Sequence, residues 1–443
     1  MQSSGTPPAV STAEASTESA ETGGRIASAA LWALGVIFAA NFFSYLDRQL
    51  VSALEKPLRL DLGLGSVEYN LLWTLFTIGY MVCSPFIGFV SDRWRRPRLF
   101  AACILIWSLA TIASGMATSK YVLYVARILI GLGEAGCLVI GSSLISDFFP
   151  KESRGRALSL FSLGLPLGGT AAFILAGLLI KWNVSWRYLF YIAGIPGFLL
   201  MGLLWVLAEP PRGGSDDPGG QGHGPVKGGF GQYLQLLKTP TLIFVVLAQA
   251  FAVIILIPLV HDGVQFFVEV RGMTPEGARI TLGIIALIAG AIGNTLSGFL
   301  GDRLRKRYKG AYAAMAGVSF LIGYPCLLVG FSASQRWLFL TALTMGALCI
   351  FLCMPAVNTQ IANASRPTQR AMAWAMAVFI LHLLGDTLAP PIFGVVDHKV
   401  GRLTAFLIFS TALIPASICC FLAARTAARD EERIAAEAAN PRV

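Results

Sequence analysis

Residues 41–53 read Asn-Phe-Phe-Ser-Tyr-Leu-Asp-Arg-Gln-Leu-Val-Ser-Ala and close an apolar run that begins near Ala29. A helix over this run of about 26 residues is roughly 39 Å long, which is enough to cross a bilayer with some tilt. The run nevertheless carries an adjacent acid and base, Asp47 and Arg48, about two turns from its outer end. An ionised side chain at that depth costs at least about 2.5 kcal/mol, so it normally faces protein or an internal water-filled space and has a function. We therefore expect the rest of the chain to shelter this pair and to use it.

The composition is that of a protein with many membrane spans. Hydrophobic residues make up 55% of the 443 residues and charged residues only 13%, about half the usual quarter. Apolar segments of about 20 residues recur between short charged or Gly/Pro-rich loops, which predicts helices and not a β-barrel. The formal net charge is +10. We attribute it to loops that orient the spans and not to nucleic-acid binding.

We predict an all-α membrane protein with twelve transmembrane helices in two bundles of six. The Gly-rich segment 209–238 is expected to be a flexible cytoplasmic linker between bundles at 29–208 and 239–424. Residues 1–24 lack the basic start of a cleavable signal. Residues 1–28 are expected to be a disordered cytoplasmic tail, and residues 425–443 a second cytoplasmic tail. The predicted spans are 29–54, 70–90, 98–117, 122–147, 156–180, 187–208, 239–260, 276–300, 311–331, 337–360, 370–395 and 402–424.

Basic residues in the loops predict the orientation. The loops after spans two, four, six, eight and ten hold more Lys and Arg than the alternate loops. By the positive-inside rule these loops and both termini are cytoplasmic. We expect the membrane to be the cell (inner) membrane.

A short motif occurs once in each half. Residues 88–96 read Gly-Phe-Val-Ser-Asp-Arg-Trp-Arg-Arg after span two, and residues 298–307 read Gly-Phe-Leu-Gly-Asp-Arg-Leu-Arg-Lys-Arg after span eight. The shared pattern is Gly, three residues, Asp-Arg, two residues and then a base. Its presence at corresponding places in two six-helix halves indicates a duplicated bundle.

These residues resemble the loop motif of the major facilitator superfamily, and the resemblance covers nearly the whole chain beyond the tails. It implies the major facilitator fold, in which two pseudo-symmetric six-helix bundles surround a central cavity and rock to give alternating access. In that family the motif is associated with locking the cytoplasmic gate. The resemblance therefore implies gating roles for Gly88, Asp92, Arg93, Arg96, Asp302 and Arg303.

A narrower resemblance rests on four segments. Tyr-Leu-Asp-Arg at 45–48, Arg127 with Gly-Leu-Gly-Glu-Ala at 131–135, Leu-Pro-Leu-Gly at 165–168, and His-Leu-Leu-Gly-Asp at 382–386 followed by Ala-Pro at 389–390 are similar to the spinster subfamily. Members of that subfamily are proton-linked carriers of lysophospholipids and sphingosine phosphate. The resemblance implies an amphipathic substrate of the same kind.

Span four carries a second acid and base. Arg127 and Glu134 are seven residues apart and so lie on one helix face, at depths similar to that of Asp47 or deeper. We expect two acids and two bases to meet between spans one and four, with Asp47 as the proton carrier and Glu134 as its partner or a second site. Arg48 and Arg127 then serve as counter-charge or as forks for an anionic head group, and Arg48 either pairs with Glu134 or turns into the cavity. The alternative is a permanent ion-pair network that fixes helix packing.

The C-terminal half lacks charge at the positions that correspond to Asp47 and Glu134. The charged half therefore faces a mostly apolar wall, an arrangement that suits a substrate with a polar head and an apolar body. The aromatic residues Tyr45 and Phe43 are candidates to line the cavity.

Span eleven contributes one candidate pair of its own. His382 and Asp386 are one turn apart on the same face and could relay protons or bind a head group. Alternatively, Asp386 hydrogen-bonds backbone groups freed by Pro390 and Pro391. His261 is expected to lie in an outer loop, exposed to solvent and without a function.

Three function hypotheses remain. The first is a proton-coupled carrier of an amphipathic, lipid-like anion, with a multidrug or organic-anion/proton exchanger as the alternative and a non-transporting membrane receptor as the third. No nucleophile–base set, phosphate loop or metal cluster appears in the sequence, so we expect no enzyme, no metal, no cofactor and no use of ATP. All eight cysteines lie inside apolar spans, so we expect no disulfide. The expected partners are the substrate, protons and membrane lipids, with no nucleic acid, and the protein is expected to be a monomer.

Overall fold

The structure is a computed structural model that describes residues 12–216 and 229–439. Within these residues, twelve helices are long and apolar enough to cross a membrane. The prediction of twelve helical spans is therefore confirmed, and most boundaries differ from the predicted ones by a few residues.

The first six spans form one bundle, the N half. They are α1 (Thr12–Ala53), α3 (Ser66–Ser91), α4 (Arg96–Gly115), α5 (Lys120–Phe148), the pair α6 (Arg154–Ser162) and α7 (Gly164–Lys181), and the pair α8 (Arg187–Gly194) and α9 (Pro196–Val206). The short helix α2 (Glu55–Leu62) connects α1 to α3.

The last six spans form the C half. They are α11 (Pro240–Glu269), α12 (Pro275–Arg305), α13 (Ala311–Ser332), α14 (Arg336–Asn363), a composite eleventh span, and the pair α17 (Arg402–Ser410) and α18 (Leu413–Ala439). The eleventh span consists of η1 (Pro367–Gln369), α15 (Arg370–Leu381), the π-helical turn η2 (His382–Asp386) and α16 (Ala389–Val400). Helix α10 (Gln232–Leu236) precedes the C half.

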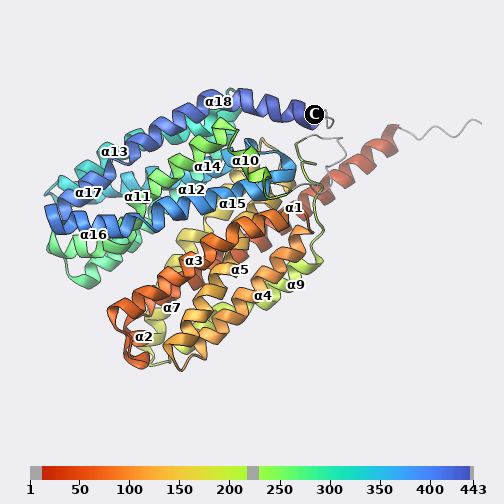
Figure 1. Ribbon diagram of the computed structural model, residues 1–443. Helices are drawn as coiled ribbons and strands as arrows, with labels where there is room; N and C mark the ends of the chain where they lie inside the picture. The colour runs from red at the N-terminus through yellow and green to blue at the C-terminus, as the bar shows by residue number, and fades with distance from the viewer. Residues whose placement is uncertain (1–11, 217–228, 440–443) are drawn as a thin grey trace, which may run out of the picture.

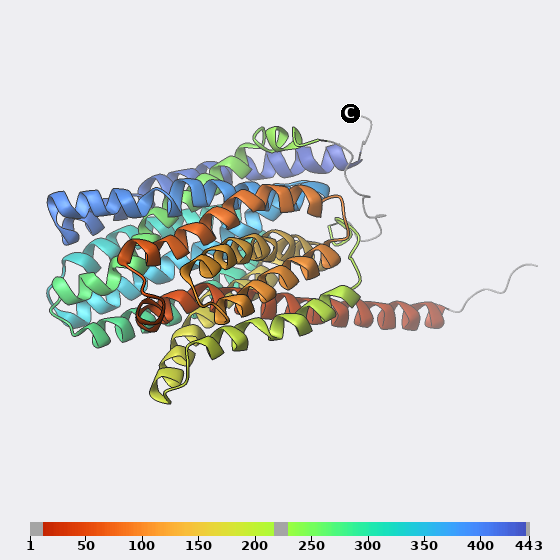
Figure 2. The same ribbon diagram turned by 60° about the horizontal axis from the view of Figure 1, so that its bottom comes forward.

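The two halves lie side by side and are not parallel throughout (Figure 1). They come closest at the end where α1 begins and α18 ends, which we call the terminal end. They diverge toward the opposite end, which carries α2 and the connection from α16 to α17 and which we call the far end. The view in Figure 2 shows the same two groups of helices.

Glycines allow the close helix contacts that place the charged residues of the N half. A Cβ on Gly131 of α5 would lie 2.3 Å from the carbonyl oxygen of Phe76 in α3, and a Cβ on Gly168 of α7 would lie 2.3 Å from that of Phe42 in α1. Any larger residue would force these helices apart. The packing therefore fixes α5, which carries Glu134, against α3, and α1 against α7.

Pro166 interrupts one helix and leaves free a carbonyl that binds the other half. Pro166 has no N–H to offer the carbonyl of Ser162, so the helix is interrupted between α6 and α7. That carbonyl instead accepts a hydrogen bond of 3.3 Å from Asn294 Nδ2 of α12, in the other half.

The structure differs from the sequence prediction at the tails and the linker. Helix α1 begins at Thr12, so residues 12–28 are helical where a disordered tail was expected, and α18 runs without a break to Ala439. Segment 209–216 is ion-paired to both halves, and residues 232–236 form α10. Residues 1–11, part of the linker at 217–228, and residues 440–443 lie outside the described residues.

Candidate functional site

Asp47 lies inside the N half, between α1, α4 and α5. Its side chain is 1% exposed and accepts a hydrogen bond of 2.7 Å from Thr111 Oγ1. Arg127 Nη2 is 3.6 Å from Asp47 Oδ1, close enough to attract but too far for a hydrogen bond. Within the described residues, neither Asp47 Oδ1 nor Arg127 Nη2 has a hydrogen-bond partner. The pair is therefore a loose one.

Arg48 turns away from Asp47 and pairs with Glu134, as one of the two sequence alternatives predicts. Arg48 Nη2 donates to Glu134 Oε2 at 3.2 Å, and Glu134 is fully buried. The guanidinium also lies 4.8–4.9 Å from the ring centroids of Tyr45, Phe76 and Tyr80, at cation–π distance. The two acids and two bases thus meet as predicted, in two separate pairs.

The C half faces this site with the π-helical turn η2. His382 Nδ1 is 2.5 Å from Asp386 Oδ2, and the Thr387 N–H donates to the carbonyl of His382 at 3.0 Å, which is the wide π-type hydrogen bond. Pro390 and Pro391 lack the N–H groups that would continue the α-helical pattern, which explains why the backbone rearranges here. The described hydrogen bond of the Asp386 side chain is to His382, and none to the backbone groups near Pro390 and Pro391 is described.

An aromatic side chain joins the two halves of the site. The ring of Tyr80 lies under the guanidinium of Arg48 and edge-on to the ring of His382, with centroids 5.0 Å apart. A line of contacts therefore runs from Glu134 through Arg48 and Tyr80 to His382 across the interface.

The structure also places two further residues from the sequence analysis, His261 and Phe43. His261 lies within α11, which extends to Glu269, and its ring contacts Trp73 of the N half edge-on at 5.5 Å, so its assignment to an outer loop is wrong. Phe43 is half-buried and packs edge-on against Phe42.

At the terminal end the repeated motif joins the two halves by reciprocal contacts, which we call the gate. Asp92 accepts hydrogen bonds from the backbone N–H groups of Ala371 and Met372, at the start of α15. Asp302 accepts hydrogen bonds from those of Gly155 and Arg156, at the start of α6. Each motif carboxylate thus binds the N-terminus of a helix in the opposite half, where N–H groups are unpaired and the helix dipole favours negative charge.

The other predicted gating residues differ in the contacts that they make. A Cβ on Gly88 would lie 2.4 Å from Ala375 Cβ of the C half, so only glycine permits this contact. Arg93 stacks on Phe89 at 3.6 Å, and Arg96 donates to Asp147 at 2.5 Å. Arg303 is exposed, and no contact with the other half is described for it.

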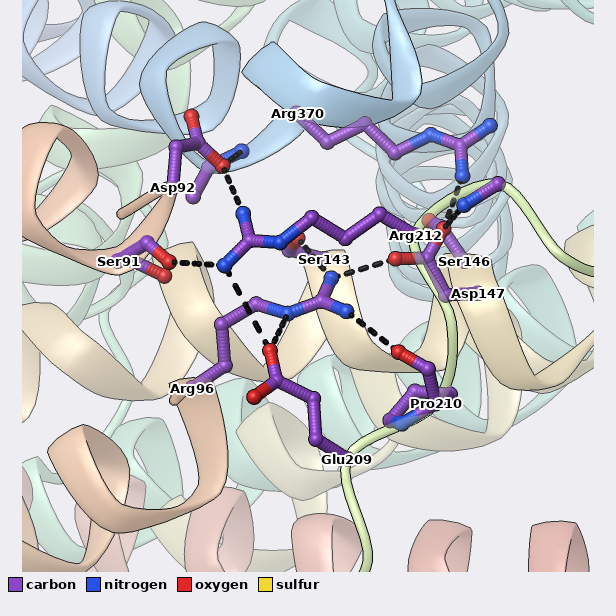
Figure 3. Close-up of polar contacts among 12 residues, drawn as sticks. Ser91, Asp92, Arg96, Ser143, Ser146, Asp147, Glu209, Pro210, Arg212 and Arg370 are labelled. Atoms are coloured by element: carbon purple, nitrogen blue, oxygen red, sulfur yellow. Dashed lines mark hydrogen bonds and ion pairs between the residues drawn. The ribbon is translucent and has the colours of Figure 1, made fainter. Parts of the chain in front are cut away.

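A network of charges missed by the sequence prediction completes this gate (Figure 3). Asp147 binds both Arg96 of its own half and Arg370 of the C half. Arg212 of the linker donates to the carbonyls of Ser91 and Trp94 and lies 3.6 Å from Asp92. These charges lie at the predicted ends of spans or in the linker, where burial is not expected, although the recurrence of an arginine seven residues after Asp147 and after Asn363 could have indicated it.

Two gate carboxyls outside the spans have shifted pKa values. Burial raises the pKa of Asp92 to about 7, against the opposing effect of its N–H donors and Arg212. Burial also opposes the charge of Asp216, but the guanidinium groups of Arg154 and Arg370 outweigh it and hold the pKa of Asp216 well below its usual range. Asp216 is therefore fully charged near neutral pH.

The chemistry of the site is that of a binding and charge-exchange centre. Among the described residues, no three His, Cys, Asp or Glu side chains are grouped so that they could hold a metal ion. Twelve spans in two related halves, with buried ion pairs between them and a gate at one end, define a membrane carrier.

Comparison with known proteins gives the family. The family model described as Major Facilitator Superfamily matches residues 37–390. The chain belongs to this superfamily, whose members are transporters and not enzymes.

Relatives found by sequence include spinster proteins. The chain is 27% identical over 380 residues to Protein spinster of Drosophila melanogaster, covering 82% of this chain and 61% of that protein. It is 27% identical over 386 residues to the sphingosine-1-phosphate transporter SPNS2 of Danio rerio, covering 84% and 76%.

Solved structures share the fold. A bacterial homologue of the human lysosomal transporter Spinster, in an inward-facing and unoccupied conformation, matches with TM-score 0.62 and 22% identity over 91% of this chain and 98% of that one. The transporter FucP in the outward conformation matches with TM-score 0.72 and 16% identity over 88% and 98%. The protein is thus a secondary transporter of the major facilitator fold, related to the spinster family.

Proposed function

We propose that this protein is a proton-coupled carrier of an amphipathic, lipid-like anion that works by alternating access. The observation that carries the proposal is that two buried carboxylates each have an oxygen that accepts no described hydrogen bond. Asp47 Oδ1 and Glu134 Oε1 are both buried without a hydrogen-bond partner in the described residues. Each is an oxygen to which a proton can add without breaking an existing hydrogen bond.

Coupling follows from the loose pair. A proton on Asp47 removes the attraction that holds Arg127 at 3.6 Å, so Arg127 can move when Asp47 is neutral and is held when it is charged. Proton binding then favours one arrangement of α1 against α5. The two arrangements are the inward-open and outward-open states of the carrier.

The substrate class is supported by the surroundings of Arg48. Its side chain is 13% exposed while Glu134 is fully buried, so Arg48 is the cation through which the site reaches a ligand. Aromatic rings surround it, and a guanidinium fork binds phosphate in two-point fashion. The name of the related Danio rerio protein, a sphingosine-1-phosphate transporter, is consistent with a phosphate-bearing lipid.

We further propose that the terminal end is cytoplasmic and that the membrane is the cell membrane. The basic loops of the terminal end support this orientation. In the state described, the gate at that end is closed by Asp92 and Asp302.

The test is flux in proteoliposomes under an imposed pH gradient. Purified protein is assayed with lysophospholipids, sphingoid phosphates and organic-anion drugs, with Asp47→Asn as the test variant. Asp61→Asn, which removes an exposed ion pair with Arg187 far from the site, is the matched control. We expect Asp47→Asn to abolish pH-driven flux and Asp61→Asn to retain it. Flux of drugs alone would favour the exchanger, and the absence of any flux in the parent would favour a receptor.

A further inference from the structure

The gate contains a second pair of residues that occurs once in each half, and the two copies differ in charge. In the N half Asp147 is followed seven residues later by Arg154, and in the C half Asn363 is followed seven residues later by Arg370. The side chains cross between halves: Arg370 of the C half binds Asp147, and Arg154 of the N half donates to Asn363 Oδ1 at 2.8 Å. One arginine therefore meets a carboxylate, while its counterpart meets a neutral amide.

The missing negative charge comes from the linker. Asp216 Oδ1 accepts from Arg154 and Asp216 Oδ2 accepts from Arg370, so this one carboxylate lies between the two repeat-related arginines. Arg154 is fully buried and Arg370 is 1% exposed. Two buried guanidinium groups this close repel each other unless a carboxylate separates them.

The linker segment is held by the N half and reaches the C half at its end. Arg96 Nε of α4 donates to Glu209 at 3.1 Å, Gly213 N donates to Asp147 Oδ1 at 3.0 Å, and Ser215 Oγ donates to the carbonyl of Ser146 at 3.1 Å. Asp216, in contrast, also binds Arg370 of the C half. When the halves separate, the contact between Asp216 and Arg370 must therefore break while the segment stays on the N half.

We propose that residues 209–216 are a latch that holds the gate closed. Asp216 is its bridging residue, because its carboxylate supplies the negative charge that Asn363 lacks. The proposal rests on the proposed alternating access and adds the linker to the groups that set its balance. Among the described residues, loss of the Asp216 charge leaves Arg154 with neutral hydrogen-bond partners beside Arg370, and this favours separation of the halves at the terminal end.

The latch can be tested with a cysteine that is buried only while the gate is closed. Ser159 of α6 is 2% exposed, has no hydrogen-bond partner among the described residues, and faces Gly298 of α12 across the interface between the halves. Ser159→Cys therefore reports separation of α6 from α12 through its rate of maleimide labelling. The parent with its eight native cysteines gives the background rate.

Three variants are compared in the Ser159→Cys background. We expect Asp216→Asn to raise the labelling rate at least about fivefold, because the labelled population is the open one. Asp216→Glu, which keeps the charge, is expected to stay within about twofold of the parent. Asp61→Asn is the matched control at the far end and should have no effect. Equal rates for Asp216→Asn and the parent would overturn the latch.

Rescue separates a gating role from a merely structural one. Asn363 Nδ2 is buried without a hydrogen-bond partner among the described residues, so Asn363→Asp breaks no described bond and supplies the absent charge. We expect Asp216→Asn with Asn363→Asp to label as slowly as the parent. If the double variant is labelled as fast as Asp216→Asn alone, the charge compensation is contradicted. The labelling rate of the double variant can still be compared with that of the parent if Asp216→Asn alone folds poorly.

Failure of the latch and failure of the proposed function are distinguishable. Labelling needs neither substrate nor a pH gradient, whereas the flux test depends on both. Unchanged labelling in Asp216→Asn together with lost flux in Asp47→Asn would reject the latch and keep the carrier.

Discussion

The carboxylates of the central site and those of the terminal gate are bonded in opposite ways. At the gate, Asp92, Asp147, Asp216 and Asp302 each accept hydrogen bonds on both carboxylate oxygens. At the site, Asp47 and Glu134 each leave one buried oxygen without a partner among the described residues. An unmade hydrogen bond in a buried place costs about 1–3 kcal/mol.

The difference indicates two tasks. A carboxylate whose two oxygens both accept hydrogen bonds fixes the geometry around it, because moving it breaks several hydrogen bonds at once. A carboxylate with an unpaired oxygen gains a bond when a proton or a ligand arrives, so its preferred conformation depends on what is bound. We therefore expect substitutions at the gate to change the balance of conformations, and substitutions at the site to change proton coupling and binding.

The largest effect is expected for Arg370→Gln. This change leaves the buried carboxylates of Asp147 and Asp216 without their common cation, and breaking a buried pair in this way costs about 3–5 kcal/mol. Labelling of Ser159→Cys should rise at least about 20-fold. Arg303→Gln, at an exposed arginine of the same end, is the control and should leave the rate unchanged. A rate for Arg370→Gln near that of the control would mean that the network does not hold the gate.

Glu134→Gln should give the next largest effect, and only on transport. The change keeps the shape but removes the charge that fixes Arg48. We expect pH-driven flux to fall about tenfold, while labelling of Ser159→Cys stays within about twofold. Labelling that rises in parallel with lost flux would erase the distinction between site and gate.

Arg48→Lys should separate lipids by their head groups. Lysine keeps the positive charge but loses the planar fork and the stacking on Tyr45, Phe76 and Tyr80. Binding of a phosphate-bearing lysolipid should weaken about fivefold, and binding of a neutral lysolipid of the same chain length should not change. Thermal-shift titrations with both lipids measure this. Equal weakening of the two would show that Arg48 does not read the head group.

The smallest effects concern Asp92 and pH. Because burial raises the pKa of Asp92 to about 7, this carboxyl carries less than a full charge near neutrality. Asp92→Asn should then raise labelling less than about threefold, and less than Asp216→Asn does.

Asp216 should show no titration in the same range. Its pKa lies below the usual value near 4, so its stabilisation of the closed gate is complete above that value and is lost only as the pH falls below it. The ratio of labelling rates between Asp216→Asn and the parent should therefore be constant from pH 6 to pH 8. A ratio that approaches one at pH 6 would contradict full ionisation.

The sequence predicted those features that follow from periodicity, charge and repetition. Twelve apolar runs, the seven-residue spacing of Arg127 and Glu134, and the repeated Gly and Asp of the loop motif are each local patterns. The structure places them as expected. The pairing of Arg48 with Glu134 was one of the two alternatives that the sequence left open.

Other features depend on tertiary approach and left no local signal. Asp216 lies in a segment rich in Gly, Ser and Asp, a composition typical of a flexible linker, and its role exists only because Arg154 and Arg370 meet there. His261 follows Pro258 and precedes Asp262, which reads as the end of a span, yet α11 continues to Glu269.

Proton release or uptake during transport tests the central claim most directly. Proteoliposomes with weak internal buffer and a trapped pH indicator are given a transported lysolipid without an imposed gradient. Parent and Asp216→Asn proteins should both move protons with the substrate, and Asp47→Asn should move substrate, if at all, without a pH change. A proton signal of parental size in Asp47→Asn would contradict the account.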